Sequence, residues 1–189
     1  MDLQQPAEPA FLEASAIIDH DHPAIRARQA ELARQASNED ELIRLIFEFV
    51  RDAIRHSLDH GDEDVTYVAS DVLNRGTGLC YAKSHLAAAL YRRSGIPAGF
   101  TYQRLNTDEG AVLHGLVAIQ QHGSWRRLDV RGTKPHLPAE YRSTGDVLAY
   151  QGEWVEDLPE VMPCPAPSIL RALSLETPLS RIPLPSSTR

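Results

Sequence analysis

The sequence is poor in cysteine, in positive charge and in long apolar runs, and each shortage excludes a class of protein. Only two of its 189 residues are cysteines, Cys80 and Cys164, so neither a disulfide framework nor a four-cysteine zinc site can form. The net charge of −7 provides no basic field for a nucleic acid, and no common nucleic-acid-binding motif is present. No apolar segment approaches the roughly 18–20 residues that span a bilayer, and residues 1–6 do not resemble a signal peptide.

These shortages lead us to expect a cytoplasmic protein that binds neither membrane nor nucleic acid and needs no cofactor. The chain is 42% hydrophobic and 24% charged, which suffices for one ordinary domain with a buried core. We predict a loose N-terminal segment over residues 1–20, the domain over residues 21–161 and a proline-rich tail over residues 162–189. That tail holds six of the 13 prolines, so it either wraps the domain or hangs free, but does not form a sheet.

The apolar pattern has a period of 3.6 in the first half of the chain and a period of two later. It predicts three helices, over residues 23–36, 39–55 and 80–94, with Asp21 or His22 capping the first and Asn38 the second. Residues 57–71 are rich in aspartate and glycine, which predicts a loop. Strands are predicted over residues 100–105, 111–120 and 124–130. Helices followed by an antiparallel sheet indicate an α+β fold.

Cys80 opens the third predicted helix, directly after residues 76–79, Gly-Thr-Gly-Leu. A helix N-terminus carries unpaired N–H groups and a partial positive charge, and both favour a thiolate over a thiol. The same N–H groups can bind the oxyanion of a tetrahedral intermediate. Cys80 is therefore a candidate nucleophile, although a lone cysteine is also often a buried structural residue.

His114 lies in an apolar strand, where a histidine is more often a hydrogen-bonded core residue than a catalyst. Asp129, on the following strand, changes that balance. If the hairpin loop is His122-Gly123, His114 lies opposite Arg131 and diagonal to Asp129 on the same face, about 7–8 Å away between backbones. An odd-length loop would instead put His114 and Asp129 on opposite faces unless a bulge intervenes. With the two-residue loop, Cys80, His114 and Asp129 can form a catalytic triad, in which Asp129 orients the imidazole and His114 takes the thiol proton.

The pattern formed by Gly78-Leu79-Cys80, the helix end at residues 93–98, the strand histidine and Trp125 shortly before Asp129 resembles the transglutaminase-like superfamily of papain-fold cysteine enzymes. The resemblance covers about residues 41–134. It implies a papain-like core with Cys80 as nucleophile, His114 as base and acid, and Asp129 as the residue that orients it. The stretches 80–86 and 95–105 are similar to a bacterial branch described as cysteine proteases.

The sequence departs from the family pattern at two places. Gly115 follows the histidine, where aromatic and acidic residues are common. No tryptophan precedes Trp125, and no clear glutamine precedes Cys80, so the family pattern does not identify the side chain that completes the oxyanion hole. Tyr67 and Gln103 are the two candidates for it.

Other polar residues have both a functional and a structural reading. Tyr81 lines the substrate cleft or packs in the core, and Arg131 holds a substrate carboxylate or pairs with Asp129. His56 and His60, four residues apart near acidic residues, suggest either a metal site or a solvated loop, and the second reading is favoured. Cys164 is expected to be an unactivated thiol.

We therefore predict a cysteine peptidase or amide hydrolase that acts on a peptide or protein amide through a thioester at Cys80. Hydrolysis is favoured over transfer to an amine, because no residue marks an amine site. Three alternatives stay open: an amine-accepting acyltransferase, a catalytically idle domain used for binding, and a metal-dependent hydrolase built on residues 56–64.

Overall fold

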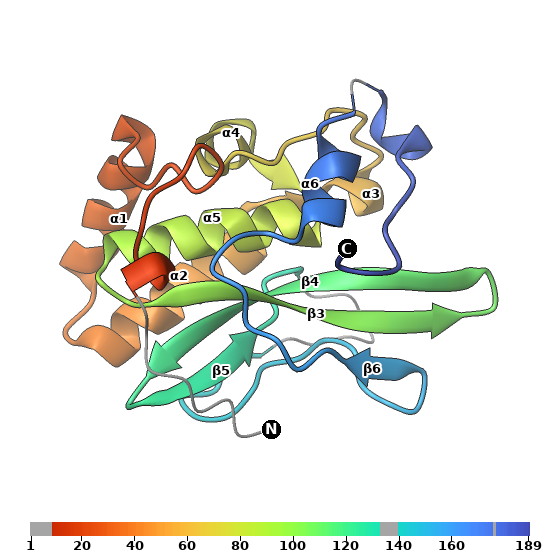
Figure 1. The fold of residues 1–189 in the computed structure, drawn as a ribbon. Coiled ribbons are helices and arrows are strands. Elements are labelled where there is room, and N and C mark those ends of the chain that lie inside the picture. Colours follow the sequence, from red (N-terminus) through yellow and green to blue (C-terminus); the bar gives the residue numbers. More distant parts are fainter. Residues whose placement is uncertain (1–8, 133–139, 176) are drawn as a thin grey trace.

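The computed structural model describes residues 9–132, 140–175 and 177–189 and confirms the predicted α+β fold (Figure 1). The helices are α1 (Pro23–Gln35), α2 (Glu39–Ala53), α3 (Ser57–His60), α4 (Ala69–Arg75), α5 (Cys80–Arg93) and α6 (Pro167–Leu173), with 3₁₀ turns η1 (Pro9–Phe11) and η2 (Leu179–Arg181). The strands are β1 (Arg55–His56), β2 (Thr77–Gly78), β3 (Ala98–Thr107), β4 (Gly110–Gln121), β5 (Ser124–Leu128) and β6 (Val155–Asp157).

The three predicted helices are confirmed to within two residues, because their ends are encoded locally. The His22 ring nitrogen accepts the N–H of Ala24 at 3.2 Å, and the Asn38 side chain accepts the N–H of Glu41 at 2.9 Å. The predicted loop over residues 57–71 is wrong in part, since it contains α3 and the start of α4. A four-residue helix is too short to be stable alone, and contacts with distant residues hold α3 in place.

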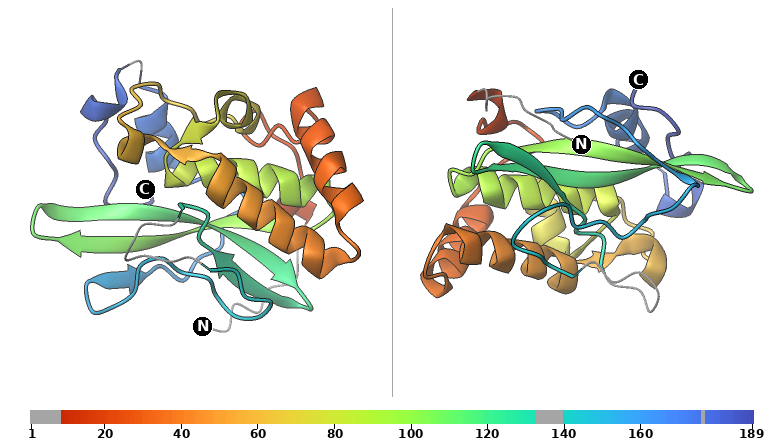
Figure 2. Two further views of the ribbon diagram at one scale, coloured as in Figure 1. Left: turned by 180° about the vertical axis from the view of Figure 1, so that it is seen from behind. Right: turned by 90° about the horizontal axis from the view of Figure 1, so that it is seen from below.

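Helix α5 is the centre of the molecule, and 13 of its 14 residues are buried. Helices α1, α2 and α4 pack on one side of it, and strands β3 and β4 pack on the other. The right-hand view of Figure 2 shows β3 and β4 in front of α5. The N-terminus of α5, where Cys80 lies, is therefore enclosed between the helical layer and the sheet.

The main sheet has the antiparallel strand order β5-β4-β3-β6, and β3 and β4 form a long hairpin (Figure 1). The pairs Gln121↔Ser124 and Val117↔Leu128 confirm the register expected from a His122-Gly123 loop. Strand β5 ends at Leu128, two residues earlier than predicted, because the next residue bonds to another segment: the Asp129 N–H donates to the carbonyl of Val147 at 2.8 Å. The predicted pairing of Arg131 opposite His114 is therefore wrong.

The segments that flank the predicted domain lie on it. Phe11 is buried with its ring 4.7 Å from that of Trp125, and Ile18 is buried in the main core; residues 1–8 of the predicted loose segment lie outside the described residues. The described part of the proline-rich tail wraps the domain and does not hang free. The carbonyl of Pro185 accepts the N–H of Leu113 on the outer edge of β4 at 2.7 Å.

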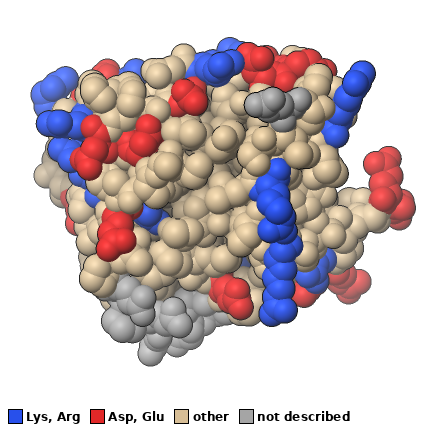
Figure 3. All heavy atoms as spheres, turned by 45° about the horizontal axis from the view of Figure 1, so that its top comes forward, with Lys and Arg blue, Asp and Glu red and all other residues tan. Residues whose placement is uncertain are grey.

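The face seen in Figure 3 carries acidic and basic side chains interspersed with one another, and its Lys and Arg side chains do not merge into one continuous basic field. Among the described residues, no helix has both the length and the apolar character needed to cross a membrane.

Candidate active site

Cys80 is the first residue of α5 and is 8% exposed. The short strand β2 delivers the chain to this point, and Gly78 makes the approach possible: a Cβ there would lie 2.9 Å from Cβ of Ala82 and 3.1 Å from the Thr66 hydroxyl. Gly76 has a φ of 65° and ends α4 in the left-handed conformation. The backbone geometry and close packing of this turn thus account for both glycines.

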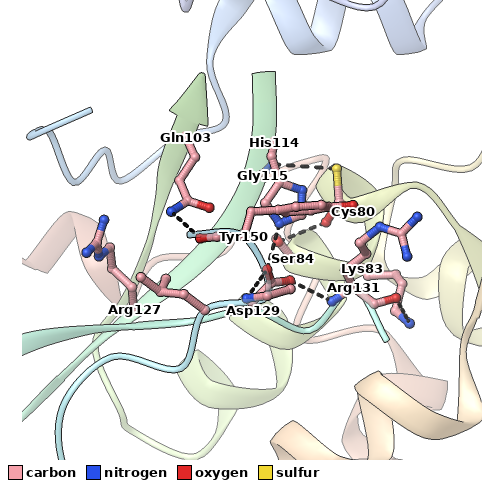
Figure 4. Close-up of polar contacts among 12 residues, drawn as sticks. Cys80, Lys83, Ser84, Gln103, His114, Gly115, Arg127, Asp129, Arg131 and Tyr150 are labelled. Carbon is pink, nitrogen blue, oxygen red and sulfur yellow. Dashed lines mark hydrogen bonds and ion pairs between the residues drawn. The ribbon is translucent and has the colours of Figure 1, made fainter. Parts of the chain in front are cut away.

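His114 and Asp129 form a buried hydrogen-bonded pair beside Cys80 (Figure 4). His114 Nε2 lies 2.7 Å from Asp129 Oδ2, with the two residues 3% and 0% exposed. The carboxylate is held by two further donors: the backbone N–H of Arg131 at 3.0 Å and that of Ala149 at 3.1 Å. Since an ionised carboxylate only accepts, Nε2 must carry a proton, and Nδ1 is the nitrogen left for Cys80.

Cys80 and His114 each shift the pKa of the other through charge and a hydrogen bond. Burial alone raises the pKa of the Cys80 thiol, but the charge and hydrogen bond of His114, with a smaller contribution from His56, lower it to about 6. Burial lowers the pKa of His114, but Asp129 and the Cys80 thiolate raise it to about 10. Burial also opposes the charge on Asp129, and His114 with the two backbone N–H groups keeps the pKa of that carboxyl low. Near neutral pH the site therefore holds a thiolate and an imidazolium.

Gly115 explains the first departure from the family pattern. A Cβ at this residue would lie 2.7 Å from a ring carbon of Tyr81 and 3.3 Å from its Cα, so only glycine fits between β4 and the start of α5. The Gly115 N–H points to the Cys80 Sγ at 3.5 Å. The absence of a side chain here is what lets the strand that carries His114 approach the thiol.

The remaining predicted residues lie near this centre in different settings. The Tyr81 hydroxyl donates to the carbonyl of Leu113, which ties α5 to β4 beside His114. The Gln103 amide donates to Asp157 at 2.8 Å and to the Tyr150 carbonyl at 3.3 Å. The Arg131 guanidinium forms two bonds to Asp59, at 2.9 and 3.0 Å, and so pairs with this residue instead of Asp129.

Tyr67 packs against the hydrophobic core, and its carbonyl receives the N–H of His85 at 2.7 Å. The alternative metal reading placed His56 and His60 at one site. The structure places them apart: His56 is buried next to Cys80, whereas the exposed His60 contacts the backbone carbonyl of His56. No group of three or more possible metal ligands occurs among the described residues. Cys164 is a free, exposed thiol.

Sequence reasoning missed three side chains of this region. The Tyr150 ring lies edge-on against that of His114, with centroids 4.8 Å apart. Lys83, fully buried, donates to the carbonyls of Ile54, Arg131 and Arg51 at 2.5, 2.9 and 3.1 Å, which joins the end of α2 to the segment after Asp129. His56 lies against Cys80. The sequence did signal Lys83, because a lysine in the apolar stretch of α5 is unusual. The positions of Tyr150 and His56 depend on long-range pairing.

Several solved structures of other proteins resemble this chain. Among solved structures, a putative cysteine protease from Cytophaga hutchinsonii superposes with a TM-score of 0.55 at 19% identity, over 64% of this chain and 40% of that one. A putative protease from Parabacteroides distasonis gives a TM-score of 0.42 at 16% identity, over 59% and 25% of the two chains. The periplasmic domain of TgpA from Pseudomonas aeruginosa gives 0.47 at 21% identity, over 64% and 45%.

The chain thus spans less than half the length of these structures, and no curated protein matches it. The model of one protein family, described as the transglutaminase-like superfamily, matches residues 26–156 and thereby includes Cys80, His114 and Asp129. This match covers more than half of the chain, and with the α+β fold and the buried cysteine at the start of α5 it leads to one conclusion: the chain belongs to the transglutaminase-like superfamily.

Proposed function

We propose that this protein is a cysteine amide hydrolase that cleaves a peptide or isopeptide bond through a thioester at Cys80. The observation that carries the proposal is the buried His114–Asp129 hydrogen bond beside Cys80 at the start of α5, an arrangement that lowers the pKa of the thiol. A structural cysteine needs no such partners, whereas a nucleophile must be ionised at working pH.

In the proposed first step, the Cys80 thiolate attacks the amide carbon, and the carbonyl electron pair moves to the oxygen. His114 then gives its Nδ1 proton to the amide nitrogen, the C–N bond breaks and the amine leaves. In the second step, water attacks the thioester while His114 takes one of its protons, the C–S bond breaks, and the carboxylic acid product leaves the restored thiolate. Asp129 keeps the ring oriented and stabilises its positive charge in both steps.

Water is the proposed acceptor of the acyl group. Transfer to an amine uses the same thioester and differs only in what attacks it, so the two reactions share Cys80, His114 and Asp129. A reducing cytoplasm suits a protein with two free thiols, and we propose that location for it.

The test is a panel of fluorogenic peptides, an isopeptide and an acyl donor with a primary amine, each offered to the native protein and to Cys80→Ser. We expect hydrolysis by the native protein, unaffected by a chelator and abolished by alkylation or by Cys80→Ser. Amine incorporation in place of hydrolysis would identify an acyltransferase. Loss of activity in chelator would support a metal-dependent hydrolase. No activity on any substrate of the panel would favour a binding domain.

A further inference from the structure

A second histidine lies against Cys80. Strand β1 pairs in parallel with β2, and this register sets His56 opposite Gly78, two residues before the nucleophile. The His56 side chain is buried, with 7% of the residue exposed. Its hydrogen bond and charge contribute, after those of His114, to lowering the pKa of Cys80.

The orientation of the His56 ring follows from its other nitrogen. Nδ1 is buried without a hydrogen-bond partner and lies 3.7 Å from Asp59 Oδ2. Arg131 holds this carboxylate with two bonds, at 2.9 and 3.0 Å. Because Nδ1 faces Asp59, Nε2 is the nitrogen available to Cys80. The pair His56–Asp59 therefore resembles His114–Asp129 in composition, with a looser contact between ring and carboxylate.

Of the two side chains first considered for the oxyanion hole, Gln103 has its amide bonded to Asp157 and to the Tyr150 carbonyl, and Tyr67 has its ring packed on the core. His56 in contrast presents a nitrogen to the thiol whose carbonyl adduct must be stabilised. The backbone N–H of Cys80, as the first residue of α5, has no acceptor one turn earlier in its own helix.

We propose that His56 is a catalytic residue whose Nε2–H donates to the oxyanion of the tetrahedral intermediate, together with the backbone N–H of Cys80. As the S–C bond forms, negative charge moves from sulfur to the former carbonyl oxygen. The donor that held the thiolate then bonds to that oxygen. When the intermediate collapses the electron pair returns to the C=O bond, the C–N bond breaks, and His114 supplies the proton of the leaving amine. His56 keeps its own proton throughout. This role rests on the proposed function and adds one residue to it.

Two reactions of the same thiolate separate this role from a simple effect on ionisation. p-Nitrophenyl acetate acylates a thiolate through a tetrahedral oxyanion, and the release of p-nitrophenolate reports the rate. Iodoacetamide alkylates the same thiolate by displacement at carbon, with no oxyanion. Both rates are measured at about pH 9, where Cys80, with a pKa of about 6, is ionised, and mass spectrometry confirms Cys80 as the labelled residue.

For His56→Leu we expect the acylation rate to fall at least about tenfold, since one oxyanion donor contributes about 10²–10³ in rate with ordinary substrates. The alkylation rate should change less than about twofold. His56→Gln, whose amide N–H can still donate, should retain acylation to within about threefold. His60→Gln, which removes an exposed imidazole from the adjacent helix α3, is the matched control and should change neither rate.

If the acylation and alkylation rates fall equally in His56→Leu, His56 acts only on the ionisation of the thiolate or on the fold, and the proposal is overturned. The proposal is also overturned if neither rate falls. If His56→Leu does not fold, as judged by circular dichroism, His56→Gln is compared with His56→Asn, whose amide is one methylene shorter. Selective loss of acylation in the Asn variant supports the proposal, and equal rates in both variants overturn it. Because the ester needs no peptide specificity, failure of peptide hydrolysis would refute the proposed function and leave this test standing.

Discussion

The ring of Tyr150 stands at 80° to the ring of His114, with centroids 4.8 Å apart, and so packs in a T-shaped contact with the imidazole that bonds to Asp129. The neighbouring Ala149 N–H donates to the same carboxylate. One short segment between β5 and β6 thus both packs on the His114–Asp129 pair and adds a hydrogen bond to it. A buried hydrogen bond is electrostatically stronger than one open to water.

This relationship predicts that Tyr150→Ala lowers kcat/KM by about ten- to hundredfold, because water then reaches the His114–Asp129 bond and the imidazole loses one of its contacts. Tyr150→Phe keeps the ring and should retain activity to within about threefold. Steady-state kinetics on the fluorogenic peptide cleaved by the native protein would measure both. Equal losses in the two variants would show that the hydroxyl, and not the ring, matters.

The pH dependence of alkylation follows from the lowered pKa of Cys80. The thiolate is the reactive form, so the rate with iodoacetamide should rise as pH increases through about 6 and level off by pH 8. Activity should follow the same rise and should fall again above about pH 10, where His114 loses its proton. Mass spectrometry of the Cys80 and Cys164 peptides gives both rates in one sample, and labelling in denaturant confirms that both thiols are free.

Removal of the imidazole should shift this profile. In His114→Ala the largest influence that lowers the pKa of Cys80 is gone, so burial dominates and the midpoint moves upward. Asp129→Asn should move it in the same direction by less, since it weakens the imidazolium without removing the ring. Cys164 labelling should not change in either variant. A profile for His114→Ala that coincides with the native one would refute the thiolate–imidazolium pair.

Gly115→Ala should lower kcat/KM by about a hundredfold, because a Cβ 2.7 Å from the Tyr81 ring pushes β4, and His114 with it, away from Cys80. We expect the free energy of unfolding to fall by about 2 kcal/mol as well. Gly123→Ala is the matched control: its φ of 81° makes the substitution cost about 1–3 kcal/mol in a turn with open space around it, while activity should be unchanged. Denaturant unfolding and peptide kinetics on both variants provide the comparison.

Lys83→Met should reduce the free energy of unfolding by about 3 kcal/mol. The buried ammonium donates to the carbonyls of Arg51, Ile54 and Arg131, and a thioether leaves these acceptors unsatisfied. Urea unfolding followed by circular dichroism measures the change. A loss below about 1 kcal/mol would mean that water replaces the lysine and that α2 and the segment after Asp129 are joined by other contacts.

The sequence by itself determined the elements whose signals are local. Periodicity and caps placed α1, α2 and α5, so that Cys80 could be assigned to a helix N-terminus. Strand alternation and a two-residue turn predicted the register of β4 and β5 that the structure shows. The same alternation predicted that His114 and Asp129 share one side, although Asp129 lies just beyond the end of β5. Side-chain alternation has a strict period of two, so a correct loop length carries this information over a whole hairpin.

Only the tertiary structure decided which residues surround that centre. His56 reaches Cys80 because β1 pairs in parallel with β2 across 22 positions of sequence, from residue 56 to residue 78, and no local pattern encodes that pairing. Arg131 joins Asp59 because β5 ends at Leu128, where Asp129 bonds to Val147. Such contacts depend on the competition between distant partners for each backbone and side-chain group, and folding of the whole chain resolves that competition.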